Sequence, residues 1–214
     1  MDFELTRENL MVRNAIKDWV SKECGRETVS ELDEKGEYPK KLMKKLAKLG
    51  FSGMIIPEAY EGEGKNVLGA CLVVEELAHA YPALASCYAS PTFIGGAVIS
   101  ELGDDSQKDR YLSQIATKSS IVTLAFAEEN DADAEQISTK AVKENDSFVI
   151  NGRKLYVELA QQADLLLLLA KTSEDEGNEG LTLFCLEKGC EGVSISPSER
   201  MGYKGVESCQ LELK

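Results

Sequence analysis

Residues 106–127, SQKDRYLSQIATKSSIVTLAFA, contain the change of pattern that decides the fold. Before Ser120 the apolar residues recur at three- and four-residue spacing, which is typical of helices that bury one face. After Ser120 they alternate with a period of two, which is typical of strands. The sequence therefore predicts an all-helical domain over residues 1–120 and an all-β domain over residues 121–214.

Five helices are expected in the first domain. Thr6 is the expected N-cap of the first helix, and Pro39 can lie in the first turn of the second, which Gly50 ends in the left-handed conformation. The fourth helix is apolar on all sides and ends at Gly103, so we expect it to lie buried at the centre of the domain. The last three helices are expected over residues 67–80, within 84–102 and over 106–115.

Eight short strands are expected in the second domain, with turn signals at Asn151–Gly152, Gly177–Asn178 and Gly189. Short strands at this spacing favour a closed or two-layered antiparallel barrel. The predicted fold class is therefore α+β with two domains, an all-α domain followed by an antiparallel β-barrel. The expected strands read IVTLAFA, ISTKAVK, SFVIN, KLYVEL, DLLLLLAKT, LTLFCLE, GVSIS and CQLEL.

Composition excludes several classes of function. The net charge of −13 argues against nucleic acid or an anionic membrane surface as a partner, because both need basic patches. The first residues have no secretory signal pattern, and the longest apolar run, LLLLLA at residues 165–170, is too short to span a bilayer. Six scattered cysteines without a C-x-x-C pair indicate reduced thiols. We expect a soluble, cytoplasmic protein without a membrane span.

Few residues are candidates for catalysis or metal binding by themselves. His79 is the only histidine, and neither a second histidine nor a paired cysteine is available to complete a metal site with it. Glu75 and Glu76 are possible catalytic carboxylates, but a solvated helix face is the ordinary place for such residues. The loop Gly62-Glu63-Gly64 lacks the strand–turn–helix setting of a dinucleotide site. No catalytic residue and no metal ligand is predicted.

A resemblance to a known family rests on many short motifs in a common order. They include LAKLGFSGMIIPEAYEGEG, VVEELA and LGDDSQKDRYLSQIA in the first domain, and VINGRK, ADLLLLLAKT and MGYKGVESCQLEL in the second. With this order and spacing, nearly all 214 residues resemble the amino-terminal and middle domains of the acyl-CoA dehydrogenase family. The resemblance implies the helical domain and the β-barrel described above.

The resemblance also implies a cofactor and a reaction. Members of the family hold FAD between the middle domain and a carboxy-terminal helical domain, and remove two hydrogens across Cα–Cβ of an acyl-CoA thioester. The reduced flavin is usually reoxidised by electron-transferring flavoprotein. This resemblance ends with the middle domain, so we expect the carboxy-terminal domain, with its usual catalytic glutamate and much of the FAD surface, to be absent.

Two flavin-contacting motifs of the family are altered. The family segment TEP-x-AGSD corresponds to AEENDAD at residues 127–133, so that Ala127 replaces a hydroxyl residue and Glu129 replaces the proline. The family motif K-x-W-I-T-N corresponds to KLYVEL, in which Glu158 replaces the hydroxyl residue near flavin N5. The positions that match the flavin site, and that we expect to be degenerate, are Phe126, Ala127, Glu128, Tyr156, Val157 and Glu158.

These alterations leave several interpretations open. The acidic loop is a solvated turn, a new surface for a basic partner, or a flavin site with unusual contacts. For the chain, we expect a non-catalytic or partner-dependent subunit in acyl-CoA metabolism, from which FAD has possibly been lost. The alternative is a genuine FAD-dependent dehydrogenase subunit, or fragment, whose missing domain another chain supplies. A second dehydrogenase-family chain, self-association and acyl-CoA are the expected partners.

Overall fold

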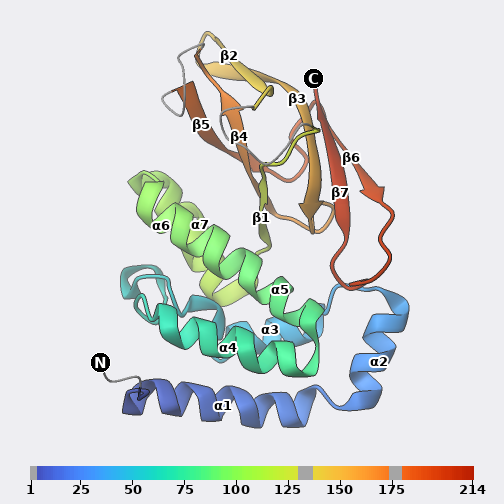
Figure 1. Ribbon diagram of the computed structural model, residues 1–214. Coiled ribbons are helices and arrows are strands. Elements are labelled where there is room, and N and C mark those ends of the chain that lie inside the picture. Colours follow the sequence, from blue (N-terminus) through green and yellow to red (C-terminus); the bar gives the residue numbers. More distant parts are fainter. Residues whose placement is uncertain (1–3, 130–136, 174–179) are drawn as a thin grey trace. The chain divides into compact units, whose positions relative to one another are not determined.

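A computed structural model describes residues 4–129, 137–173 and 180–214. The chain divides into two compact units (Figure 1). The helical unit contains residues 1–120 together with 202–206, and the β unit contains residues 121–201 and 207–214. The predicted fold class, a helical part followed by a part made of strands, is confirmed, and each unit is described by itself below.

The helical unit begins as expected, with the Thr6 hydroxyl accepting a hydrogen bond of 3.2 Å from the Asn9 amide at the start of the first helix. Gly50, at φ 82°, follows the third helix and takes the predicted left-handed conformation. The described helices are α1 Arg7–Glu23, α2 Arg26–Lys35, α3 Lys40–Lys48, η1 Phe51–Gly53, η2 Glu58–Tyr60, α4 Val67–Ala80, α5 Pro82–Ala89, η3 Ser90–Ala97, α6 Val98–Leu102 and α7 Asp105–Lys118.

Two features of the helical unit differ from the expectation. The helix α2 was not predicted, because none of its residues is buried and its sequence therefore lacks a core-facing period. The predicted fourth helix is present as α5, the π-helical segment η3 and α6. This stretch, Pro82–Leu102, is long and apolar enough to cross a membrane by length and composition alone. Because 61% of its most apolar window is buried inside the structure, it equally fits a core helix.

The β unit contains a curled seven-stranded sheet in the order β1-β4-β2-β3-β7-β6, with β5 paired to β4. The prediction of a purely antiparallel barrel is wrong, because β1 and β4 run parallel, with Val122 opposite Leu165. The side chains of β4 are almost all buried, which explains its continuous run of leucines. The strands are β1 Val122–Ala125, β2 Lys140–Glu144, β3 Ser147–Glu158, β4 Leu165–Lys171, β5 Leu181–Glu187, β6 Val193–Ser198 and β7 Ser208–Leu213.

The predicted turn at Asn151–Gly152 is also wrong. Both residues lie inside the long strand β3, which joins the two strands expected there. The turn between β2 and β3 lies earlier, where Asn145 has a φ of 55°. Glycine is needed at position 152 because a Cβ atom there would clash with the side chain of Thr139 on the neighbouring segment. Gly177–Asn178 lies outside the described residues.

Candidate functional site

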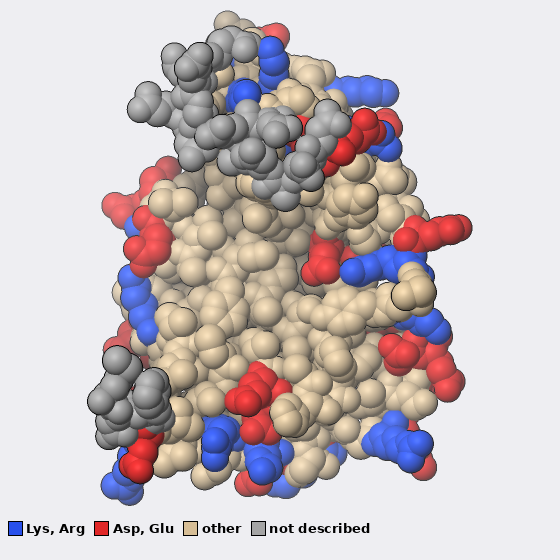
Figure 2. Space-filling view, viewed as in Figure 1, with Lys and Arg blue, Asp and Glu red and all other residues tan. Residues whose placement is uncertain are grey.

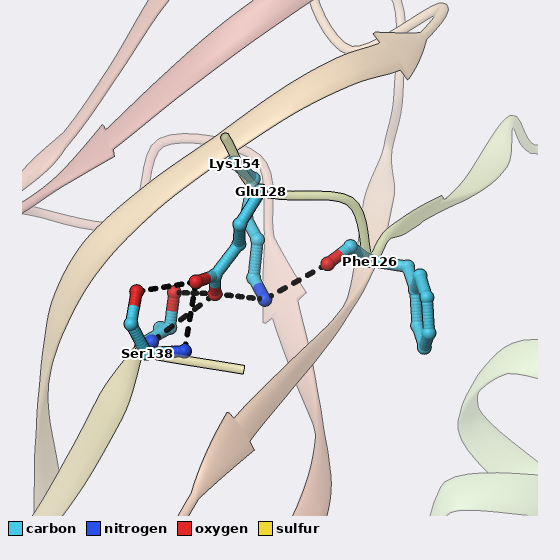
Figure 3. Close-up of polar contacts among 5 residues, drawn as sticks. Phe126, Glu128, Ser138 and Lys154 are labelled. Atoms are coloured by element: carbon cyan, nitrogen blue, oxygen red, sulfur yellow. Dashed lines mark hydrogen bonds and ion pairs between the residues drawn. The ribbon is translucent and has the colours of Figure 1, made fainter. Parts of the chain in front are cut away.

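A buried ion pair lies at the centre of the first predicted flavin motif (Figure 3). The Nζ atom of Lys154 on β3 lies 2.8 Å from Oε1 of Glu128, in the segment that follows β1. The side chain of Lys154 is 0% exposed and that of Glu128 is 8% exposed. Lys154 also donates a hydrogen bond of 3.1 Å to the carbonyl oxygen of Phe126. The lysine therefore contacts the motif at two points, the backbone of Phe126 and the side chain of Glu128.

The carboxylate of Glu128 accepts further hydrogen bonds from the segment before β2. The backbone amides of Ser138 and Thr139 donate to it at 2.8 and 3.1 Å. The hydroxyl groups of the same two residues also donate to it, the Thr139 hydroxyl at 2.5 Å. Figure 3 shows the Glu128 carboxylate pointing toward Ser138 and Lys154. Its oxygens are thus occupied by the protein itself.

These contacts determine the charges of the pair. Burial by itself would raise the pKa of Glu128, but the hydrogen bonds from Lys154, Ser138 and Thr139 outweigh it and hold the pKa at about 2. Burial lowers the pKa of Lys154, and the neighbouring Glu128 carboxylate opposes that shift. At neutral pH the glutamate is therefore ionised, and Lys154, Ser138 and Thr139 hold its carboxylate.

The two residues before Glu128, Phe126 and Ala127, are less buried than its carboxylate. Ala127 accepts a hydrogen bond of 2.8 Å at its carbonyl oxygen from the Leu155 amide, so its backbone is tied to β3. The side chains of Phe126 and Ala127 are half-buried. The methyl group of Ala127 has no hydrogen-bonding atom, so this position offers a ligand only its backbone.

The second predicted motif forms a β-bulge on β3. The register against β7 shifts between Lys154 and Val157, and Tyr156 has the unusual φ of 55°. Its ring is 70% exposed, whereas Val157 is 1% exposed and packs inside the unit. The bulge therefore presents the Tyr156 ring to solvent at a backbone conformation that bulky residues rarely adopt.

Glu158 carries a carboxylate just beyond this bulge. Its side chain is 41% exposed, and Oε1 lies 3.4 Å from a guanidinium nitrogen of Arg200. Its neighbour Leu159 donates a backbone hydrogen bond of 3.0 Å to the carbonyl oxygen of Glu207, next to β7. The six predicted residues thus differ in exposure. The side chains of Glu128 and Val157 are buried, Phe126 and Ala127 are half-buried, Glu158 is partly exposed and Tyr156 is exposed.

Sequence analysis missed several residues of this arrangement. Lys154, Ser138 and Thr139 complete the Glu128 network, and Arg200 pairs with Glu158. A buried lysine is unusual enough that only a partner makes it tolerable, but the sequence does not say which of many acidic residues that partner is. Arg200 comes from the segment after β6, forty-two residues from Glu158. The contact between Arg200 and Glu158 depends on the pairing of β3 with β7.

The other candidate residues lie apart from this arrangement. His79 and Glu75 are exposed on α4, and Glu76 is half-buried there. In the described ranges, no group of three His, Cys, Asp or Glu side chains could hold a metal ion. A Cβ atom at Gly62 would clash with the carbonyl group of Ile56, so this glycine serves a close backbone approach. Of the acidic loop, Asp131 and Asp133 lie outside the described residues.

Comparison with known proteins identifies relatives that act on, or are named for, acyl-CoA compounds. A probable acyl-CoA dehydrogenase of Bacillus subtilis is 30% identical over 217 residues, which cover 100% of this chain and 57% of that protein. A subunit of the caffeyl-CoA reductase–Etf complex of Acetobacterium woodii is 31% identical, over 94% of this chain and 53% of that protein. The chain spans a little over half the length of these relatives.

Solved structures agree with these relatives. The butyryl-CoA dehydrogenase of Megasphaera elsdenii has a TM-score of 0.90 at 29% identity, covering 100% of this chain and 57% of that one. A glutaryl-coenzyme A dehydrogenase complex has a TM-score of 0.94 at 26% identity, covering 100% and 55%. Residues 6–119 match the model of the acyl-CoA dehydrogenase N-terminal domain, and residues 123–214 match that of the middle domain. This chain therefore belongs to the acyl-CoA dehydrogenase family.

Proposed function

We propose that this chain serves in acyl-CoA metabolism as a subunit that does not carry out FAD-dependent α,β-dehydrogenation by itself. It acts either without catalysis or together with another chain. One observation carries the proposal: neither the methyl group of Ala127 nor the carboxylate of Glu158 is a hydrogen-bond donor. The resemblance places these two residues where the family uses hydroxyl residues. The carboxylate at position 158 is also partly exposed beside the bulge of β3.

The residues at these positions fit a flavin only in part. The exposed ring of Tyr156 can stack on a planar ring system, as the aromatic residue of the family motif does. The polar positions do not fit, because a flavin that is reduced gains negative charge and needs donors or positive potential around it. Two negative charges about 4 Å apart repel by roughly 4 kcal/mol at an effective dielectric constant of about 20. These residues by themselves therefore do not support reduction of a flavin.

The Glu158–Arg200 pair does not remove this objection. Its side chains are 41% and 28% exposed, and such a pair is stabilised by less than about 1 kcal/mol in water. Arg200 offsets part of the negative charge of Glu158, but the pair as a whole is close to neutral and adds no net positive potential for an anion. Hence we expect oxidised FAD to bind weakly and reduced FAD more weakly still.

The flavin content of the protein tests the proposal. The chain, expressed with excess riboflavin and purified, is expected to be colourless. When FAD is added, an acyl-CoA should not bleach its visible absorbance. A yellow protein with one FAD per chain, reduced by an acyl-CoA, would show that the chain is a dehydrogenase without help. Calorimetric titration with a saturated acyl-CoA then separates a ligand-binding subunit from a purely structural one.

A second candidate function is that of a genuine FAD-dependent dehydrogenase subunit. The ordered Glu128–Lys154 pair and the solvent-exposed Tyr156 support it, because a flavin needs a fixed backbone and an accessible aromatic ring beside it. In this case another polypeptide supplies the part of the dehydrogenase that this chain does not match in its relatives. Co-expression with each full-length acyl-CoA dehydrogenase of the host should yield a yellow complex. Colourless complexes throughout would leave only the non-catalytic role.

Self-association is part of the proposal as well. Figure 2 shows a broad uncharged area in the middle of the visible face, with charged side chains mostly toward its edges. Large exposed apolar areas usually mark a contact surface. We expect the chain, in the cytoplasm, to form an oligomer or to bind a related subunit, which sedimentation velocity measures. The large apolar side chains exposed in the helical unit are Leu10, Met11, Leu49, Val67, Leu68 and Leu102.

A further inference from the structure

The helix α3 carries an unusual density of positive charge. Its sequence, KKLMKKLAK, places five exposed lysines in nine residues, in a chain whose net charge is −13. The four apolar residues of the helix, Leu42, Met43, Leu46 and Ala47, are buried. All five lysines therefore lie on the solvent-exposed side of α3, and α3 itself contains no acidic residue.

The five lysines fall into two rows with different surroundings. In the row of Lys41 and Lys45, acidic neighbours offset the charge. Lys45 lies 2.5 Å from Glu23 on α1, and Lys41 acts electrostatically on Glu31 of α2. The row of Lys40, Lys44 and Lys48, one helical turn apart, is called the lysine row below. Among the described residues none of its members forms an ion pair closer than 4.0 Å.

This arrangement costs the isolated chain stability. Like charges four residues apart on a helix are destabilising by a few tenths of a kcal/mol per pair, and the row contains two such pairs. Among the described residues no carboxylate forms an ion pair with any of these three lysines, although the chain has 37 acidic residues. We propose that the lysine row is a docking surface for a short acidic segment of a partner protein.

The length and setting of the row favour a short protein segment over a longer polyanion. Four residues of helix rise about 6 Å, so the row spans about 12 Å. This spacing matches carboxylates one turn apart on a helix, or two residues apart on an extended chain. A nucleic acid or an anionic membrane extends well beyond the row and meets the acidic remainder of the surface. A short segment avoids that repulsion, since salt screens charges beyond about 8 Å.

The test uses an octaglutamate peptide and three forms of the whole chain. The row variant carries Lys40→Gln, Lys44→Gln and Lys48→Gln. The matched control carries Lys17→Gln, Lys22→Gln and Lys188→Gln, which remove the same charge from exposed positions elsewhere. Circular dichroism establishes that both variants keep their helices. Calorimetry then measures peptide affinity at about 50 mM and about 300 mM salt, where screening differs strongly.

We expect the wild-type chain and the control to bind the peptide with similar affinity, and the row variant to bind at least tenfold more weakly. Binding should weaken at the higher salt concentration. Equal losses in the two variants would mean that only net charge matters, and would overturn the proposal. The proposal is also overturned if the wild-type chain does not bind the peptide, or if it binds vesicles of phosphatidylserine more tightly than the peptide. None of these outcomes depends on flavin or acyl-CoA binding, so the proposed function is tested separately.

Discussion

Lys154 lies 2.8 Å from Glu128, and together they join the segment after β1 to the middle of β3. With the lysine side chain fully buried, the pair ties the first motif to β3. We propose that this frame is independent of the flavin contacts, whose positions follow from the family resemblance. Separate variants test the frame and the contacts.

Removing the lysine should damage the scaffold. In Lys154→Met the Glu128 carboxylate stays buried without its charged partner, so we expect a loss of roughly 3–5 kcal/mol in the free energy of unfolding. Urea denaturation followed by circular dichroism measures it. Arg153→Met is the matched control, since the pair of Arg153 with Glu129 is exposed and should cost less than about 1 kcal/mol. Equal losses in the two variants would contradict a special role for the buried pair.

The pair also predicts a dependence of stability on pH. The pKa of Glu128 is about 2 in the folded chain and 4.5 in the reference state, so its contribution is fully present above about pH 4.5. Between these values the unfolded chain binds more protons, and stability falls as the pH falls. The contribution lost is at most roughly 3 kcal/mol. In Glu128→Gln this part of the pH dependence should disappear. An unchanged acid limb in urea titrations would refute the assignment.

Gly152 gives a prediction about packing beside the same pair. A Cβ atom at this position would clash with Thr139, which donates to Glu128. Gly152→Ala should therefore destabilise the chain by roughly 1–3 kcal/mol, as overpacked cores do. Gly202→Ala, where a Cβ atom meets nothing within 4 Å, is the control and should be nearly neutral. Thermal unfolding separates the two, and equal melting temperatures would count against this reading.

Much of the fold could be predicted from local patterns. The cap at Thr6, the left-handed Gly50 and the change of period after Ser120 all depend on neighbouring residues, and the structure contains each of them. The helix α2 was missed because none of its residues is buried, so its sequence shows no hydrophobic periodicity. The parallel pairing of β1 with β4 was missed because strand direction depends on long-range topology.

The candidate site was only partly predictable for a similar reason. The resemblance supplied positions such as Ala127 and Glu158, but a position does not determine what its side chain contacts. The partnership of Lys154 with Glu128 joins residues that are twenty-six apart in the sequence. That of Glu158 with Arg200 joins residues that are forty-two apart. Such pairs need the register of β3 against its neighbours, which alternation of apolar residues does not specify across a bulge.

Restoring the family's hydroxyl groups tests the central claim most directly. The variant with Ala127→Thr and Glu158→Thr regains a donor at each position and loses the opposing charge. Glu212→Thr, on the exposed part of β7, controls for the change in net charge. Equilibrium titration with FAD, followed by flavin fluorescence, measures the dissociation constant of each form. We predict at least tenfold tighter binding by the double variant, a factor that corresponds to about 1.4 kcal/mol, and no gain for the control. Stoichiometric FAD on the wild-type chain, or equal affinities for the wild-type chain and the double variant, would contradict the account.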